Sequence, residues 1–76
     1  MITVRLYGLL RLDSKIREKQ LEAESVIAVF EKLTAMGIDK TSLDGCLVLV
    51  NGKAVTKRAK LKDGDTVQLM PPVAGG

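Results

Sequence analysis

The chain has 76 residues, 46% of them hydrophobic and 28% charged, with twelve Lys and Arg against nine Asp and Glu and a net charge of +3. This composition is typical of one small globular domain near the lower size limit for independent folding, and it excludes a disordered chain. No apolar run approaches the length of a membrane span, and no secretory signal precedes the first strand pattern. The sequence therefore predicts a soluble, cytoplasmic protein without a membrane partner.

The residue types exclude most forms of catalysis by side chains. The chain has no His and a single Cys, Cys46. Zinc sites and Ser-His or Cys-His nucleophilic sites cannot be assembled from such a chain. Cys46 opens an apolar run and is interpreted as a small core hydrophobe in a reducing compartment. We therefore expect a protein that is not itself an enzyme and that binds no metal and no cofactor.

The first part of the chain predicts two strands. Residues 1–7 alternate between apolar and polar side chains with a period of two, which indicates a strand with one buried face. Residues 8–15 contain Gly, Asp and Ser and predict a connection, although their leucines are too apolar to be wholly exposed. Residues 16–24 alternate weakly between apolar and charged positions and predict an edge strand.

Residues 26–36 predict the single helix. Ser25 is a natural N-cap, and Gly37 is the residue type expected directly after a helix end. One stripe of a 3.6-residue helix is formed by the apolar residues Val26, Val29, Phe30 and Leu33. Residues 38–45 are polar and predict a linker.

The second half of the chain consists of strand and turn signals. Residues 46–50 are a continuous apolar run, which predicts a central strand buried on both faces or nearly so. The Asn-Gly pair at 51–52 is a strong hairpin signal, so residues 53–55 should return antiparallel. The Asp-Gly-Asp sequence at 63–65 predicts a second tight turn before a final alternating strand, residues 66–70.

This order of elements predicts an α+β domain with two layers. One helix between strands packs across one face of a mixed sheet of four to five strands, which is the layout of a ubiquitin-like β-grasp. We expect the β-grasp domain to comprise residues 1–70. Residues 71–76 are expected to form a flexible, extended C-terminal tail.

The tail sequence Pro-Pro-Val-Ala-Gly-Gly differs from the rest of the chain. Pro71 and Pro72 stop the preceding strand and favour an extended chain that projects from the domain, roughly 20 Å long over six residues. Gly75 and Gly76 have no Cβ and can enter a narrow slot. The α-carboxylate of Gly76 is therefore the one plausible reactive group, and the alternative is a frayed terminus without function.

The layout and the tail together resemble the ubiquitin-like sulfur carriers, most closely the small subunit of molybdopterin synthase. The matching segments are the opening Ile-Thr-Val-Arg-Leu-Tyr, the hairpin Leu-Val-Asn-Gly, and Leu-Lys-Asp-Gly-Asp-Thr-Val leading to Met-Pro-Pro-Val-Ala-Gly-Gly. In that family a ubiquitin-activating-type adenylating enzyme uses ATP to activate the terminal glycine, and a sulfur donor system converts it to a thiocarboxylate. The large subunit of molybdopterin synthase then builds the dithiolene of molybdopterin with that sulfur. The resemblance implies that Gly76 carries the sulfur and that Gly75 admits it to two active sites.

Three other functions stay open at this stage. Sulfur carriers for thiamine thiazole or cysteine synthesis also end in Gly-Gly, although the two prolines favour the molybdopterin branch. A ubiquitin-like protein modifier is a second alternative, but ubiquitin carries basic residues just before its glycines and this tail has none. A plain binding module with an irrelevant tail is the third.

The alternation of the outer strands also predicts a docking surface. Tyr7 and Met70 belong to the outward-facing sets of the first and last strands, beside the tail. An adaptable Met and an amphipathic Tyr are suitable anchors for a partner protein. Together with Pro71, Pro72 and Val73 of the tail, they form the predicted partner-docking residues.

A basic segment at 53–62 is the last feature of the sequence. Its positive charges are Lys53, Lys57, Arg58, Lys60 and Lys62. With 3% aromatic residues there is no platform on which nucleic-acid bases could stack, so we expect no nucleic-acid partner. The segment is interpreted as a solvated face, with electrostatic steering of an acidic partner as the alternative.

Overall fold

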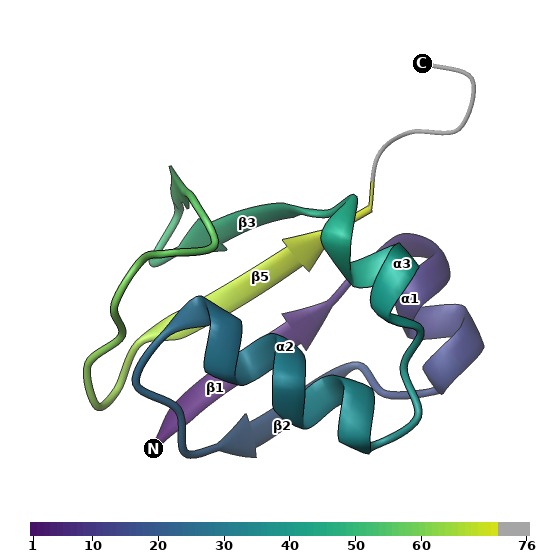
Figure 1. Cartoon of the computed structure of the whole chain (residues 1–76), viewed down its shortest axis with the longest axis horizontal. Helices are drawn as coiled ribbons and strands as arrows, with labels where there is room; N and C mark the ends of the chain where they lie inside the picture. Colours follow the sequence, from purple (N-terminus) through teal and green to yellow (C-terminus); the bar gives the residue numbers. More distant parts are fainter. Residues whose placement is uncertain (72–76) are drawn as a thin grey trace.

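The structure, a computed structural model, describes residues 1–71 as a five-stranded mixed sheet with helices on one side (Figure 1). The strands are β1 (Ile2–Leu6), β2 (Glu18–Leu21), β3 (Leu47–Val50), β4 (Lys53–Val55) and β5 (Thr66–Met70), and the helices are α1 (Gly8–Ser14), α2 (Val26–Ala35) and α3 (Lys40–Asp44). The strand order is β2-β1-β5-β3-β4, with β1 and β5 parallel and the other neighbours antiparallel. The expected β-grasp with one main helix is therefore confirmed. No helix within these residues has the length and apolar character to cross a membrane.

The first and last strands form the centre of the sheet. Val4 lies opposite Val67 and Leu6 opposite Leu69, and all four side chains are buried. The backbone N–H of Tyr7 donates to the carbonyl of Leu69 at 3.2 Å, so the pairing continues past the end of β1. The predicted strands at the two ends of the chain thus meet in the core.

Helix α2 forms as the sequence predicts. The Ser25 hydroxyl accepts a hydrogen bond from the Ala28 N–H at 3.2 Å, which satisfies a donor of the first turn. The helix ends before Gly37, whose φ of +100° is disfavoured for other residues. The Ile38 N–H then returns to the carbonyl of Leu33 at 3.1 Å, and both side chains are buried. The cap and the end signal therefore fix both limits of the helix.

Two segments that the sequence predicts as connections are short helices instead. The prediction of a loop at 8–15 is wrong: α1 occupies Gly8–Ser14 and is capped by Lys15, whose φ is +62° and whose N–H donates to the Arg11 carbonyl at 2.8 Å. The prediction of a linker at 38–45 is also wrong, since α3 occupies it, with the Asp39 carboxylate accepting from the Thr41 N–H. Neither helix exceeds two turns, so neither can show a full apolar stripe in the sequence. Helix α2 remains the main helix.

The prediction for the strand at 46–50 is correct in type but wrong in burial. Val48 in β3 is 3% exposed, whereas its neighbour Leu47 is 52% exposed. The reason is that the helices cover one face of the sheet (Figure 1). Alternate side chains of β3 therefore reach the other face. The edge strand is also shorter than the predicted 16–24, because only Glu18–Leu21 pairs with β1.

Two turns are bonded together where β5 begins. Asn51 and Gly52 both have positive φ, +51° and +86°, as the predicted Asn-Gly hairpin requires. The Asn51 amide donates to the Asp65 carboxylate at 2.9 Å, and its oxygen accepts from the Thr66 N–H at 3.0 Å. The other Asp65 oxygen accepts from the Lys62 N–H at 2.8 Å. The hairpin and the Asp-Gly-Asp turn therefore stabilise each other.

This network predicts a pH-dependent contribution of Asp65 to stability. The hydrogen bond from the Lys62 backbone, and then that from Asn51, lowers the pKa of Asp65 below its ordinary value of 3.8. Because the folded pKa is the lower one, the contribution is present above pH 3.8 and is lost as the pH falls through the folded value. Asp65→Asn should therefore lower the free energy of unfolding at pH 7, measured by urea denaturation. The difference from the wild type should shrink well below pH 3.8, and a difference that is constant with pH would contradict this assignment.

Candidate functional site

The chain leaves the sheet at Pro71, which directly follows β5 and is half-buried. Pro72, Val73, Gly75 and Gly76, which the sequence singles out, lie outside the described residues. The candidate site is therefore built from the groups that surround Pro71.

Three segments meet where the chain leaves the sheet. β1 and β5 run parallel, so Tyr7 at the end of β1 lies beside the end of β5. β3 runs antiparallel to β5, and its first residue, Leu47, lies opposite Met70. Helix α1 begins at Gly8, directly after Tyr7. Residues far apart in the sequence are thus brought to one edge of the sheet (Figure 1).

Gly8 forms a close support for the ring of Pro71. A Cβ added to Gly8 would lie 2.8 Å from Cγ of Pro71, which is closer than two such carbons approach. Gly8 also has a φ of +60°, in the left-handed region. The sequence analysis placed Gly8 in a connection and missed this contact. The one available signal was a Gly placed immediately after an alternating strand.

An apolar surface surrounds the point where the chain leaves the sheet, and we call it the exit face. It consists of Tyr7, Leu47, Leu49, Met70 and Pro71, all on or next to the side of the sheet that the helices leave open. Leu47 is the most exposed of them, at 52%, and the other four are half-buried. The Tyr7 hydroxyl accepts a hydrogen bond from Gln68 at 2.9 Å, which holds its ring over β5.

The structure therefore brings together Tyr7 and Met70, which the sequence predicted as outward-facing neighbours of the tail. It adds Leu47 and Leu49, which the sequence analysis assigned to the core. Every position of β3 is hydrophobic, so the sequence shows no alternation between apolar and polar residues there. It therefore gave no signal for which side chains of β3 face outward. The use of these residues in docking stays a prediction at this point.

The described side chains offer little reactive chemistry. Among the side chains that the structure describes, no group of three or more His, Cys, Asp or Glu is placed to hold a metal ion. Cys46 is half-buried against the core, and its thiol donates to the Ser42 carbonyl at 3.1 Å. Burial raises the pKa of this thiol above 9.0, and the nearby Lys57 only partly offsets that effect. The thiol is therefore protonated at neutral pH and is a poor nucleophile.

The basic segment at 53–62 touches the exit face only through β4, where Ala54 lies opposite Leu49, and its described cationic contacts lie elsewhere. Lys57 pairs with Asp44 at 3.1 Å, and its ammonium lies 5.7 Å from the centre of the Phe30 ring. The Lys62 backbone is bonded to the turn that precedes β5, at the end of that strand away from Pro71 (Figure 1). Steering by this segment stays a prediction that the geometry does not favour.

The contact between Gly8 and Pro71 can be tested with a matched pair of variants. Gly8→Ala forces a side chain into a left-handed conformation, which costs about 1 to 2 kcal/mol, and also pushes against Pro71. Gly64→Ala introduces strain at a φ of +90° but meets no atom within 4 Å. Both variants should lose stability in urea denaturation. Only Gly8→Ala should shift the NMR signals of Pro71, and unchanged Pro71 signals in that variant would show that Gly8 does not direct the chain.

Comparison with known proteins gives matches over nearly the full length. A family model described as the ThiS family matches residues 4–76. Small archaeal modifier protein 1 (SAMP1) from Methanosarcina acetivorans has 28% identity and a TM-score of 0.80, with 99% of this chain and 95% of that chain covered. A chain of the Helicobacter pylori complex of molybdopterin-converting factor subunits 1 and 2 has 28% identity and a TM-score of 0.75, over 99% and 97% of the two chains.

A third structure, a chain of the Amycolatopsis orientalis BexX/CysO complex, has 25% identity and a TM-score of 0.73, and both chains are covered completely. Two of these three structures are thus complexes of two different proteins. The three identities are nearly equal, so they do not separate a sulfur carrier from a modifier. Because the family model covers almost the entire sequence, this chain belongs to the ThiS family of small ubiquitin-like carrier proteins.

Proposed function

We propose that the protein is a sulfur carrier that donates sulfur, as the small subunit of molybdopterin synthase, in the biosynthesis of the molybdenum cofactor. The observation that carries this proposal is the sequence Pro-Pro-Val-Ala-Gly-Gly, with Gly76 as its last residue, directly after β5 in a chain of the ThiS family. The likeness to a chain of the molybdopterin-converting factor complex supports the molybdopterin branch.

The proposed chemistry takes place on the main chain. The Gly76 carboxylate attacks ATP and releases pyrophosphate, which gives an acyl-adenylate with a good leaving group. Hydrosulfide supplied by a donor system then displaces AMP and loses its proton, and the product is a thiocarboxylate in which one oxygen has been exchanged for sulfur. Adenylation is needed because a carboxylate is a poor electrophile. The activating partner, an adenylating enzyme of the ubiquitin-activating type, binds the ATP, and this chain supplies the acyl group.

The tail residues suit such a reaction for steric reasons. An activating site must keep water away from the acyl-adenylate, and a narrow tunnel does so. Gly75 and Gly76 add no side chain to the width of the tail. The support of Pro71 by Gly8 fixes the point from which the tail starts. The same tail can then enter the adenylating enzyme first and the large subunit of molybdopterin synthase afterwards.

The exit face is the proposed docking surface for both partners. Leu47 is half exposed although it belongs to a sheet strand, and it adjoins Met70 across the strands. Tyr and Met are enriched in protein interfaces, and a few residues near the centre of an interface provide most of its binding energy. Pro72 and Val73 follow Pro71 in the sequence, and we propose that the same partners contact them.

A protein modifier is the second candidate function, and the likeness to SAMP1 favours it specifically. Both functions begin with the same adenylation of a terminal glycine. They differ in the group that accepts the Gly76 acyl group. This acceptor is a sulfur nucleophile for the carrier and a lysine amine of another protein for the modifier. Carriers that serve thiazole or cysteine synthesis would make the same thiocarboxylate and differ only in the protein that consumes it.

The first test is the product formed on Gly76. The protein is incubated with its adenylating enzyme, ATP and a sulfur donor, and intact mass spectrometry should show the gain of one sulfur and the loss of one oxygen, localised to Gly76 by fragmentation. Deletion of Gly76, or addition of one residue after it, should abolish this change, with thermal unfolding as the control for folding. Sulfur on Cys46 would refute the carrier mechanism. An isopeptide bond to lysines of other proteins would establish the modifier instead.

The second test concerns docking, and it uses two leucine-sized residues of similar exposure. Leu47 is 52% exposed on the exit face, and Ile27 is 49% exposed on α2. Leu47→Arg should weaken binding to the adenylating enzyme and to the large subunit by about tenfold or more, because it places a charge in an apolar contact. Met70→Arg should act in the same way. Ile27→Arg should bind as the wild type does, and equal affinities for all variants in calorimetry would exclude the exit face as the docking surface.

A further inference from the structure

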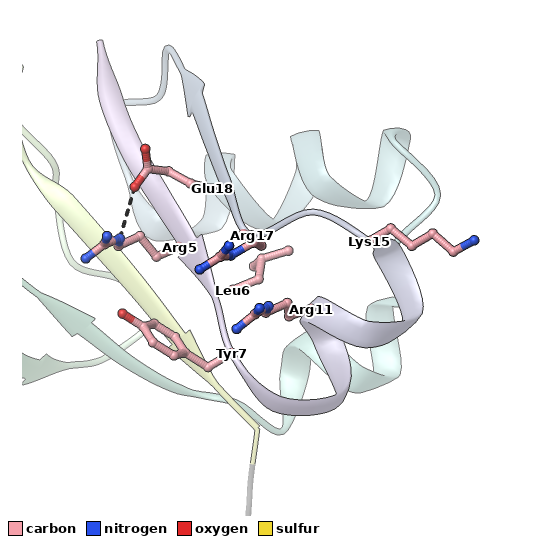
Figure 2. A pocket seen from close by; sticks show the side chains of 7 residues that line it. All are labelled: Arg5, Leu6, Tyr7, Arg11, Lys15, Arg17 and Glu18. Atoms are coloured by element: carbon pink, nitrogen blue, oxygen red, sulfur yellow. Dashed lines mark hydrogen bonds and ion pairs between the residues drawn. The ribbon is translucent and has the colours of Figure 1, made fainter.

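A surface hollow of about 540 Å³ lies next to the exit face, between the end of β1, helix α1 and the start of β2 (Figure 2). Its lining contains four cationic side chains and one carboxylate. The cations are Arg5, Arg11, Lys15 and Arg17, and the carboxylate is Glu18. Cationic groups therefore outnumber anionic ones in this hollow far more than in the chain as a whole.

The single carboxylate of the hollow already forms an ion pair. The Glu18 carboxylate pairs with Nε of Arg5 at 3.0 Å. Arg11 and Arg17 form no ion pair with any side chain that the structure describes. Figure 2 shows the guanidinium groups of Arg11 and Arg17 directed to the same side of the hollow, whereas Lys15 extends away from it. Two unpaired guanidinium groups thus remain in the hollow.

Tyr7 contributes a third donor. Its hydroxyl oxygen accepts the hydrogen bond from Gln68, so the hydroxyl proton is available to donate, and it has no acceptor among the groups that the structure describes. Tyr7 lines the hollow and also belongs to the exit face, so the two surfaces are continuous. A partner that covers the exit face would therefore also reach the hollow.

We propose that this hollow binds an acidic segment of the protein partner that docks on the exit face. Carboxylates of that segment accept hydrogen bonds from Arg11, Arg17 and the Tyr7 hydroxyl. The planar guanidinium group matches a carboxylate with two parallel hydrogen bonds, which a lysine cannot provide. The inference rests on the proposed function, because it assigns the chemistry of the surface that the carrier's partner must present.

The shape of the hollow favours a protein segment over a small anion. Sites for small molecules enclose most of the ligand surface. Here Arg5, Arg11 and Arg17 are all exposed, so a free phosphate would stay largely in water. Charged groups at the rim of an apolar contact, by contrast, are typical of protein interfaces, where they speed association and fix orientation. Since α1 begins at Gly8, a segment bound to Arg11 would lie close to the start of the tail.

The test compares two double variants with the same change in net charge. Arg11→Glu/Arg17→Glu reverses the charge of two side chains in the hollow. Lys60→Glu/Lys62→Glu reverses the charge of two exposed side chains near the start of β5. Association with the adenylating enzyme is measured by stopped flow at several salt concentrations. The first pair should slow association about tenfold at low salt, with an effect that fades as salt is added, whereas the second pair should stay close to the wild type.

A conservative variant separates steering from direct contact. Arg11→Lys/Arg17→Lys keeps the charge but removes the paired hydrogen bonds, so it should associate at the wild-type rate and dissociate faster. Thermal unfolding checks that every variant is folded. Equal slowing by both charge reversals would mean that net charge alone matters and would overturn the proposal. Wild-type rates in the reversed hollow would overturn it as well.

The outcomes also separate this inference from the proposed function. If the wild type binds the enzyme but gains no sulfur, the carrier function is refuted. The binding data then still test whether the hollow takes part in docking. If the wild type gains sulfur and Arg11→Glu/Arg17→Glu leaves binding unchanged, the proposed role of the hollow is refuted and the carrier function is supported. If the wild type does not bind the enzyme at all, both fail. Saturable binding of inorganic phosphate at physiological salt, lost in Arg11→Glu/Arg17→Glu and followed by NMR, would make the hollow a small-anion site instead.

Discussion

The parallel pairing of β1 with β5 is the interaction on which the rest of this structure depends. It joins the first and last strands of the sequence at the centre of the sheet, where Val4, Leu6, Val67 and Leu69 are all buried. Parallel strands end at the same edge, so the chain turns into α1 next to the place where β5 ends. The contact between Gly8 and Pro71 is a direct consequence. The pairing that completes the core therefore also determines where the tail begins.

Because the helices cover only one face of the sheet, the core and the open face consist of different side chains. The buried side chains of the described residues are all apolar, and none of them is polar or charged. Leu47 and Met70 are on the open side and contribute less to the core than their hydrophobicity suggests. Arg11 and Arg17 lie unpaired beside this apolar surface, without an ion pair to any described side chain. Apolar groups outside the buried core and cationic groups without a described ion pair thus lie together around Pro71.

The structure assigns little chemistry to the folded domain itself. The Cys46 thiol is held protonated by burial and is hydrogen-bonded to the Ser42 carbonyl. The hydrogen bonds of Asp65 join two turns at the end of β5 away from Pro71. Both groups therefore serve the fold.

The elements with local signals could be predicted from the sequence. Ser25 and Gly37 limited α2, the Asn-Gly pair placed the hairpin, and alternation identified β1 and β5, because caps, turns and strand faces depend on neighbouring residues. The sequence also singled out Tyr7 and Met70 as outward-facing. Only the tertiary structure decided that β3 is buried on one face, that two connections are helices, and that Arg11 and Arg17 share a hollow with Tyr7. The reason is that burial of a strand face and the meeting of side chains from different elements depend on segments distant in the chain, which no local pattern records.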